Sequence, residues 1–246
     1  MKIFLFDIDG TIMLSGGAGL RAMERAFEER YRIPNSFAEF HFQGKVDPAI
    51  FREALVKHNL PVADPDQEIR ALITKYEQYI AEEMPRSTKA ILYPGVKELI
   101  LALTGCPGVS IGLLTGNVIG GARAKLSHFD LWRYFPYGAF GSDEEIRSRL
   151  VPIALERASR HLGTVVRPGR DVYIIGDTDR DIATAKDNGC TAVGVGTLNF
   201  SAARLAELGA DIVFENFADT KRVLQTLGVA DERTDRALSE NPRFPA

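Results

Sequence analysis

The sequence predicts an α/β protein, a doubly wound, Rossmann-like parallel sheet that carries an inserted helical domain. From about residue 86 onward, short apolar runs alternate with helical patterns, which is typical of a parallel sheet with right-handed crossovers. Between the first apolar run and this alternation, residues 16–85 carry helical patterns and no good strand, as an insertion would. We therefore expect a core domain over 1–15 and 86–229, a helical domain over 16–85, and a polar tail over 230–246.

Composition and charge favour a cytoplasmic protein without a nucleic-acid or membrane partner. The 246 residues are 45% apolar and 26% charged, as in an ordinary globular protein. The net charge is −3 and the basic residues are spread along the chain, so nucleic acid is not favoured. No apolar run is long enough to span a bilayer, the chain begins in a strand rather than a leader, and two cysteines fit a reducing compartment. The sequence does not define an oligomeric state.

The individual elements follow from apolar periodicity and from helix start and stop signals. Apolar runs predict strands over 3–6, 109–114, 137–140, 171–175, 191–195 and 211–214. Helical spacing predicts helices over 20–31, 69–80, 96–103, 119–128, 150–162, 202–208 and 220–227, one that starts at 47–48, and one after 181 that stops at 188–189. Asp47 suits the N-cap and Pro48 the first helical position. The glycine-rich segment 15–19 is expected to be a hinge, because it lacks the Lys-Ser/Thr ending of a phosphate-binding loop.

The strand at 3–6 is followed by residues that suggest a binding or catalytic site. It is an unbroken apolar run, typical of a strand buried on both faces, and Asp7 and Asp9 follow it directly. Asp is a poor strand residue, so a pair at this position needs a functional reason. Ligands of open α/β sheets bind outside the carboxyl ends of the strands. Two acids there can hold a divalent cation, and one can act as a nucleophile.

Two other strands end in polar residues. Thr115-Gly116-Asn117 follows the strand at 109–114, and Asp177 and Asp181 follow the strand at 171–175. Because the carboxyl ends of parallel strands share one edge, these residues are expected to meet Asp7 and Asp9 in one crevice. Taken alone, Thr115-Gly116-Asn117 also fits an ordinary strand–helix turn with an Asn cap.

The segment Asp7-Ile8-Asp9-Gly10-Thr11 resembles the first motif of the haloacid dehalogenase superfamily. The hydroxyl after the second apolar strand and the later Gly-Asp-x-x-x-Asp pattern match the further motifs of that superfamily. The resemblance implies an inserted helical cap domain, and Gly44-Lys45-Val46-Asp47 looks like the cap loop of phosphoglycolate-phosphatase-like members. It also implies a magnesium-dependent phosphatase that acts on a small phosphorylated molecule.

The resemblance implies roles for the acids, and these agree with the charges involved. Asp7 would attack phosphorus and form an aspartyl-phosphate, and Asp9 would protonate the leaving alkoxide and then deprotonate water. Mg²⁺ would be held by Asp7, Asp177 and the Asp9 backbone carbonyl, with Asp181 holding its waters or completing the shell.

The phosphate and substrate contacts are expected from five further positions. Thr115, Gly116 and Asn117 would hold phosphoryl oxygens through a hydroxyl and backbone N–H groups. The superfamily usually places a Lys, often in Lys-Pro, ahead of a helix. The segment 143–152 has neither, and taking Pro152 as the helix-start proline gives Arg147 that place, with Arg149 as the second choice. In the cap, Lys45 could meet a substrate carboxylate or a second phosphate, or could be a solvated surface residue.

Several activities remain to be compared at this point. Asp9 argues against a dehalogenase and a phosphonatase, whose members lack that second acid. A sugar-phosphate mutase keeps both acids and stays open as the alternative to a phosphatase. A non-catalytic phospho-receiver or binding protein is less favoured, because receivers are smaller and have no cap insertion.

Overall fold

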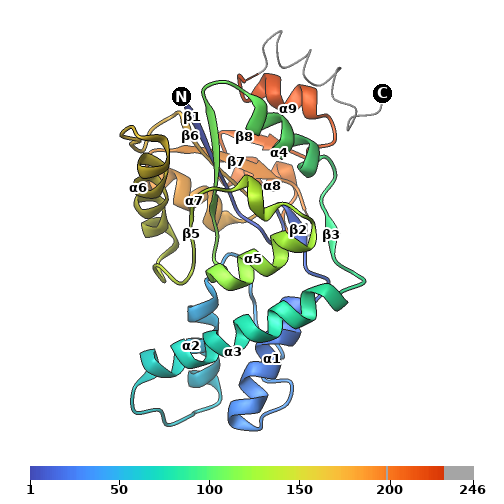
Figure 1. Cartoon of the computed structure of the whole chain (residues 1–246), viewed down its shortest axis with the longest axis vertical. Coiled ribbons are helices and arrows are strands. Elements are labelled where there is room, and N and C mark those ends of the chain that lie inside the picture. The colour runs from blue at the N-terminus through green and yellow to red at the C-terminus, as the bar shows by residue number, and fades with distance from the viewer. Residues whose placement is uncertain (198, 230–246) are drawn as a thin grey trace.

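The structure is a computed structural model that describes residues 1–197 and 199–229, so the expected tail at 230–246 lies outside the described residues. In this part of the chain the strands form a six-stranded parallel sheet with the order β5-β4-β1-β6-β7-β8 (Figure 1). This confirms the doubly wound sheet predicted from the sequence. The strands are Lys2–Phe6 (β1), Val109–Leu114 (β4), Gly138–Ala139 (β5), Val172–Gly176 (β6), Thr191–Val195 (β7) and Ile212–Phe214 (β8).

The position of β1 explains its unbroken apolar sequence. It pairs with β4 on one side and β6 on the other, and both faces are covered. Phe4 and Phe6 belong to the apolar cluster on one face, whereas Ile3 and Leu5 belong to the cluster on the other. This alternation is the period-2 geometry of a strand. β1 therefore carries the residues that follow it to the centre of the sheet edge.

Helices cover both faces of the sheet. The first cluster is completed by α4 (Val96–Gly105), α5 (Ile119–His128) and α9 (Thr220–Thr226), and the second by α6 (Leu150–Leu162), α7 (Asp179–Asp187) and α8 (Ala202–Glu207). Two 3₁₀ turns, η1 (Trp132–Tyr134) and η2 (Arg147–Arg149), lie in the connections before β5 and α6. Among the described helices, none combines the length and the apolar character needed to cross a bilayer.

Three helices form a separate group, here called the helical unit: α1 (Ala18–Tyr31), α2 (Asp47–Lys57) and α3 (Pro65–Arg86). In Figure 1 the helical unit lies below the sheet, next to α5. Two short antiparallel strands flank it, β2 (Met13–Leu14) and β3 (Ile91–Leu92), with Met13 opposite Leu92. The sequence had predicted no strand there, because two residues show no periodicity. The domain boundaries expected at 16 and 85 stay predictions.

The helical unit docks onto the start of α5 through two acids. The backbone N–H of Val118 donates to Asp47 Oδ2 at 2.9 Å, and that of Gly120 donates to Glu77 Oε1 at 2.8 Å. The side chain of Val118, the N-cap residue of α5, makes no capping hydrogen bond. The two acids of the helical unit therefore bind the N–H groups at the start of α5 that have no partner within the helix. The prediction that Asp47 is the N-cap of its own helix was wrong: Val46 is the N-cap, and Asp47 reaches across to α5.

At the contact between the helical unit and the core, two positions of the core have no room for a side chain. A Cβ on Gly116 would lie 2.1 Å from the carbonyl oxygen of Lys45, and one on Gly141 would lie 3.1 Å from Val46 Cβ. The Asp47 N–H also donates to the Gly116 carbonyl at 2.8 Å. The backbone around Lys45 and Asp47 is therefore in direct contact with the backbone of the loop after β4.

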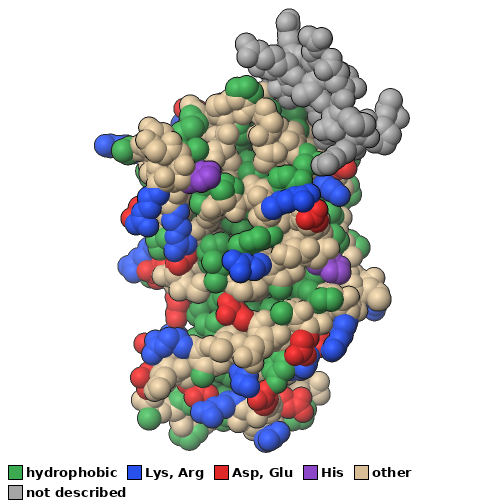
Figure 2. All heavy atoms as spheres, in the orientation of Figure 1, with side chains coloured by type: hydrophobic (Ala, Val, Ile, Leu, Met, Phe, Trp, Pro, Cys, Tyr) green, Lys and Arg blue, Asp and Glu red, His purple; other side chains and the backbone are tan. Residues whose placement is uncertain are grey.

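Acidic and basic side chains alternate over the surface of the helical unit that Figure 2 shows, without a continuous basic patch on that face. Several of them form cross-helix ion pairs, such as Arg25 with Glu82 and Glu83 and Arg30 with Glu68. Such exposed pairs contribute little individually, about 0–1 kcal/mol each. The absence of a nucleic-acid partner stays a prediction.

A substitution at Gly116 tests the close contact. Gly116→Ala should lower the melting temperature by several degrees, because the new methyl group must displace the Lys45 carbonyl; overpacking typically costs about 1–3 kcal/mol. Gly105→Ala is the matched control, since nothing lies within 4 Å of a Cβ there. Thermal unfolding of both variants is the measurement. Equal melting temperatures for the two would contradict the contact.

Candidate active site

Three buried carboxylates converge at the central edge of the sheet. Asp7 follows β1, Asp177 follows β6, and Asp181 lies in the first turn of α7. One oxygen from each lies within 4.8 Å of the others, and all three residues are buried. The expectation that these strand ends meet in one place thus agrees with where the structure puts them.

Burial and mutual repulsion change the protonation of these acids. Burial raises the pKa of Asp7 to about 6; the Arg147 charge opposes this rise, and the Asp181 charge adds to it. Burial also raises the pKa of Asp177 to about 7, with contributions from Asp181 and Asp7. Removing carboxylates from water and placing them side by side favours the neutral form. The cluster is therefore short of positive charge.

The cluster fits a magnesium ion. Carboxylate oxygens are the ligands that Mg²⁺ prefers, and the shortage of positive charge is what a cation would relieve. The side chain of Asp9 is not part of the cluster, so its expected contribution through the backbone carbonyl stays a prediction.

Asp177 accepts hydrogen bonds from two residues that were not singled out from the sequence. Thr197 Oγ1 donates to Asp177 Oδ2 at 2.9 Å, and Asn199 Nδ2 donates to the same oxygen at 3.2 Å. Both follow β7, so they end a strand at the same edge as Asp177. That position was a usable signal, because polar residues after the neighbouring strands had already been singled out for this reason.

Arg147, and not Arg149, lies at the acids. Its Nη2 is 2.6 Å from Asp181 Oδ1 and 3.1 Å from Asp7 Oδ1, and the residue is 8% exposed. Its Nε is buried and has no hydrogen-bond partner among the described residues. Arg149 is exposed and approaches Glu144 at 3.8 Å. Arg147 therefore bridges Asp7 and Asp181 and keeps one unpaired N–H donor.

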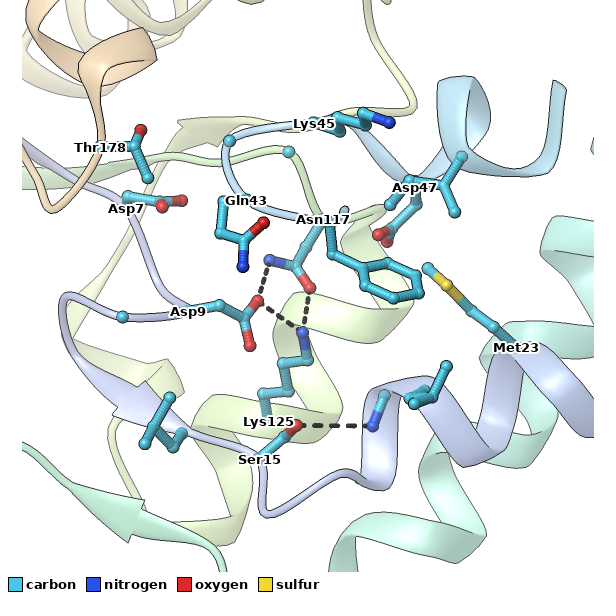
Figure 3. A pocket seen from close by; sticks show the side chains of 18 of the residues that line it. Asp7, Asp9, Ser15, Met23, Gln43, Lys45, Asp47, Asn117, Lys125 and Thr178 are labelled. Carbon is cyan, nitrogen blue, oxygen red and sulfur yellow. Dashed lines mark hydrogen bonds and ion pairs between the residues drawn. The ribbon is translucent and has the colours of Figure 1, made fainter. Parts of the chain in front are cut away.

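A second polar group lies beside the first and is built around Asp9. Asn117 Nδ2 donates to Asp9 Oδ2 at 2.8 Å, and Lys125 Nζ lies 2.6 Å from the same oxygen (Figure 3). Asn117 Nδ2 also donates to the hydroxyl of Thr115 at 2.9 Å. Thr115, Gly116 and Asn117 thus lie next to the catalytic candidates, as the sequence predicted, whereas Lys125 was missed.

The capping of α7 fixes Asp181. Thr178 is its N-cap residue, and the Thr178 backbone N–H and Oγ1 donate to Asp181 Oδ2 at 3.1 and 2.6 Å. In return, the Asp181 backbone N–H donates to Thr178 Oγ1 at 3.3 Å, which completes a capping box with Asp in place of the usual Glu. It leaves Asp181 Oδ1 for Arg147.

Between the core and the helical unit lies a cavity of about 230 Å³. Asp7, Asp9 and Arg147 line its core side. Its other side is largely apolar, with Leu20, Met23, Phe42, Ile50 and Tyr76.

Two side chains on the far side of the cavity, Tyr76 and Lys45, carry polar groups. The hydroxyl of Tyr76 is buried and has no hydrogen-bond partner among the described residues. Lys45 lines the cavity, but its ammonium group pairs with Glu53 and points away from Asp7 and Asp9 in Figure 3. The geometry therefore gives no contact between the Lys45 charge and the acids, and its role in specificity stays a prediction.

A parallel sheet with convergent acids at its central strand ends, closed over by a helical unit, is the arrangement of an α/β enzyme. The chain belongs to the haloacid dehalogenase-like hydrolase family, whose family model matches residues 1–189. The sequence had predicted this family from its motifs.

Known relatives and solved structures agree with this assignment. The chain is 26% identical to the "Probable phosphatase IndB" of Dickeya dadantii, over 78% of this chain and 80% of that protein. It is 27% identical to a phosphoglycolate phosphatase of Salmonella typhi, over 71% of this chain and 64% of that protein.

Among solved structures, a hydrolase from Pseudomonas syringae has a TM-score of 0.68 and 21% identity, covering 92% of this chain and 99% of that one. A β-phosphoglucomutase from Clostridium difficile has a TM-score of 0.67 and 17% identity, covering 93% and 97%. At these identities the two structures show a shared fold.

Proton competition provides a test of the metal site. Because burial raises the pKa of Asp7 to about 6 and that of Asp177 to about 7, protons should compete with Mg²⁺ below neutral pH. The rise in melting temperature on adding magnesium chloride should be larger at pH 8 than at pH 5.5, and EDTA should reverse it. Asp177→Asn should remove most of the rise at pH 8. A magnesium-induced rise that is independent of pH and of Asp177 would contradict the site.

Proposed function

We propose that this hydrolase is a magnesium-dependent phosphatase that acts on a small phosphomonoester through an aspartyl-phosphate on Asp7. The observation that carries the proposal is the contrast between Asp7 and Asp9, two residues apart at the end of one strand. Asp7 is 6% exposed and faces Arg147 and two other acids. The Asp9 side chain is 41% exposed and is held by Asn117 and Lys125. Unlike surroundings for two neighbouring carboxylates favour a division into nucleophile and acid–base.

In the first half-reaction a carboxylate oxygen of Asp7 bonds to phosphorus while the bond from phosphorus to the leaving oxygen breaks. Asp9 gives its proton to that leaving oxygen. Arg147 beside Asp7, and Thr115, Gly116 and Asn117 beside Asp9, would bind the phosphoryl oxygens. Asp7 and Asp177, with Asp181 beside them, would hold Mg²⁺, which would supply the positive charge that lets an anionic carboxylate approach an anionic ester.

In the second half-reaction a water oxygen bonds to phosphorus while the bond to Asp7 breaks. Asp9, now a carboxylate, takes the water proton, so that inorganic phosphate leaves and both acids return to their starting states. Such positioned proton transfer contributes about 10²–10⁴-fold. Asp9 can reach the reacting oxygens because it lines the cavity.

The chemistry of the cavity favours a small, uncharged and partly apolar leaving group. Its far side carries apolar side chains together with the Tyr76 hydroxyl, the Gln43 amide and Asp47, and both nearby lysines are already paired with acids. A carboxylate, as in phosphoglycolate, or the second phosphate of a mutase cycle would find no unpaired ammonium group among the described lining residues. A phosphatase is therefore favoured over a sugar-phosphate mutase. Such an enzyme of small metabolites fits the cytoplasmic location expected from the sequence.

Replacing the nucleophile is the direct test. Asp7→Asn should abolish magnesium-dependent hydrolysis of 4-nitrophenyl phosphate, with a loss of several orders of magnitude in kcat, because the amide cannot attack phosphorus. Asp130→Asn, an exposed acid paired with Arg133, should retain wild-type activity. Trapping of phosphate on the wild-type chain but not on the Asp7 variant would locate the intermediate. Near-wild-type turnover by Asp7→Asn would rule out Asp7 as the nucleophile.

The two arginines provide a second comparison. Arg147→Ala should lower kcat/KM by about 10²–10³-fold, since it removes a positioned donor to the phosphoryl group. It should also lower the melting temperature, because it leaves Asp7 and Asp181 without their cation. Arg149→Ala, the matched control, should change kcat/KM by less than about twofold, as expected for an exposed and distant pair. A larger loss from Arg149→Ala would show that the basic residue has been misassigned.

A further inference from the structure

Lys125 is a buried lysine that no motif of the sequence explains. It lies in the last turn of α5 and is 5% exposed. Its Nζ is 2.6 Å from Asp9 Oδ2 and 2.5 Å from Asn117 Oδ1 (Figure 3). Burying an ammonium group costs several kcal/mol unless it is paired, so this placement needs the Asp9 carboxylate and the Asn117 carbonyl oxygen.

Lys125, Asn117 and Asp9 form a closed ring of hydrogen bonds. Lys125 binds the Asn117 carbonyl oxygen, the Asn117 amide group donates to Asp9, and Asp9 accepts from Lys125. Both donors to Asp9 use Oδ2, and among the described residues no hydrogen bond ends on Oδ1. Two donors on one oxygen fix both torsion angles of a side chain that would otherwise rotate. The second oxygen is left for the cavity that Asp9 lines.

The helix that carries Lys125 is itself firmly placed. Its first N–H groups are held by Asp47 and Glu77 of the helical unit, and its C-terminal end favours a positive charge through the helix dipole. The Lys125 stem lies beside Gly19 of α1, where a Cβ would come within 3.7 Å of Cε and Nζ. Lys125 therefore has little freedom to leave Asp9.

We propose that Lys125 is a positioning residue for Asp9, an inference that rests on the proposed phosphatase function. With Asn117 it holds Oδ2, so that Oδ1 faces the leaving oxygen. Oδ1 gives its proton to that oxygen as the ester bond breaks, and later takes a proton from the attacking water. Lys125 keeps its own proton throughout, and its charge stabilises the Asp9 carboxylate that exists between the two steps.

The proposal makes a claim about leaving groups that a purely structural role does not. A nitrophenolate leaves without a proton, whereas a benzyl alkoxide needs one. Loss of Asp9 positioning should therefore affect benzyl phosphate far more than 4-nitrophenyl phosphate. Lost packing or partial unfolding lowers both rates by the same factor, so the ratio of the two kcat/KM values does not respond to it.

The test measures kcat/KM of Lys125→Met on both substrates with magnesium present. The expected loss is about 10²-fold on benzyl phosphate, the lower end of positioned proton transfer, and less than about fivefold on 4-nitrophenyl phosphate. Arg123→Met is the matched control: it removes a cation from the exposed side of the same helix, over Trp132, and should leave both rates unchanged. In an Asp9→Asn background, Lys125→Met should not change the substrate ratio further.

Each outcome is decisive. Equal losses on the two substrates, or an additional change of the ratio in the Asp9→Asn background, overturn the positioning role while the phosphatase assignment stands. A wild-type enzyme that hydrolyses neither ester overturns the proposed function and the positioning role with it. If Lys125→Met does not fold, Lys125→Gln keeps a polar group in place of the ammonium, and the same substrate ratio decides. Lys125→Arg should recover part of the benzyl phosphate activity.

Discussion

The structure depends on how negative charge is balanced at one edge of its sheet. Five aspartates, Asp7, Asp9, Asp47, Asp177 and Asp181, lie around the cavity or just behind it, and among the described residues the cationic side chains that pair with them are Arg147 and Lys125. Burial accordingly raises the pKa values of Asp7, Asp47 and Asp177. Each cation serves one subset, since Arg147 bridges Asp7 and Asp181 while Lys125 pairs with Asp9. A bound divalent cation and an anionic ester would complete this balance rather than disturb it.

The fold delivers these charges by placing three parallel strand ends side by side and by closing the helical unit over them. The closure combines apolar burial, in a cluster that the helical unit shares with the core, with polar contacts to the backbone. Asp47 and Glu77 cap a helix of the core, and Gly116 lets the Lys45 carbonyl lie against the loop after β4. The helical unit is thereby tied to α5, the helix that also presents Lys125. Motion of the helical unit would disturb α5 and, through it, the surroundings of Asp9.

Much of this arrangement could be predicted from the sequence because buried strands and the residues that end them have strong local signals. The six core strands and the meeting of Asp7 with Asp177 follow from apolar runs and their polar ends, whereas the family and the place of Arg147 followed from the resemblance of the motifs. The strands β2 and β3 were not predicted, because a run of two residues is too short to show the alternation of apolar and polar side chains. Lys125 was not singled out from the sequence, because a lysine in a helix is ordinarily a surface residue. One signal was available: Val118, Ala122 and Leu126 mark the buried stripe of α5, and Lys125 lies on that stripe.

The asymmetry between Asp7 and Asp9 shows how one strand end can supply two different chemical groups. In a strand, residues two apart point to the same side, so sequence alone gives both acids the same environment. The chain must leave the strand after Phe6 for their surroundings to diverge, and Asp9 lies instead in a turn that pairs back to Met13. That turn carries Asp9 away from Arg147 and toward Asn117 and Lys125. The division of labour between nucleophile and acid–base therefore depends on the backbone path after β1 as much as on the two carboxylates themselves.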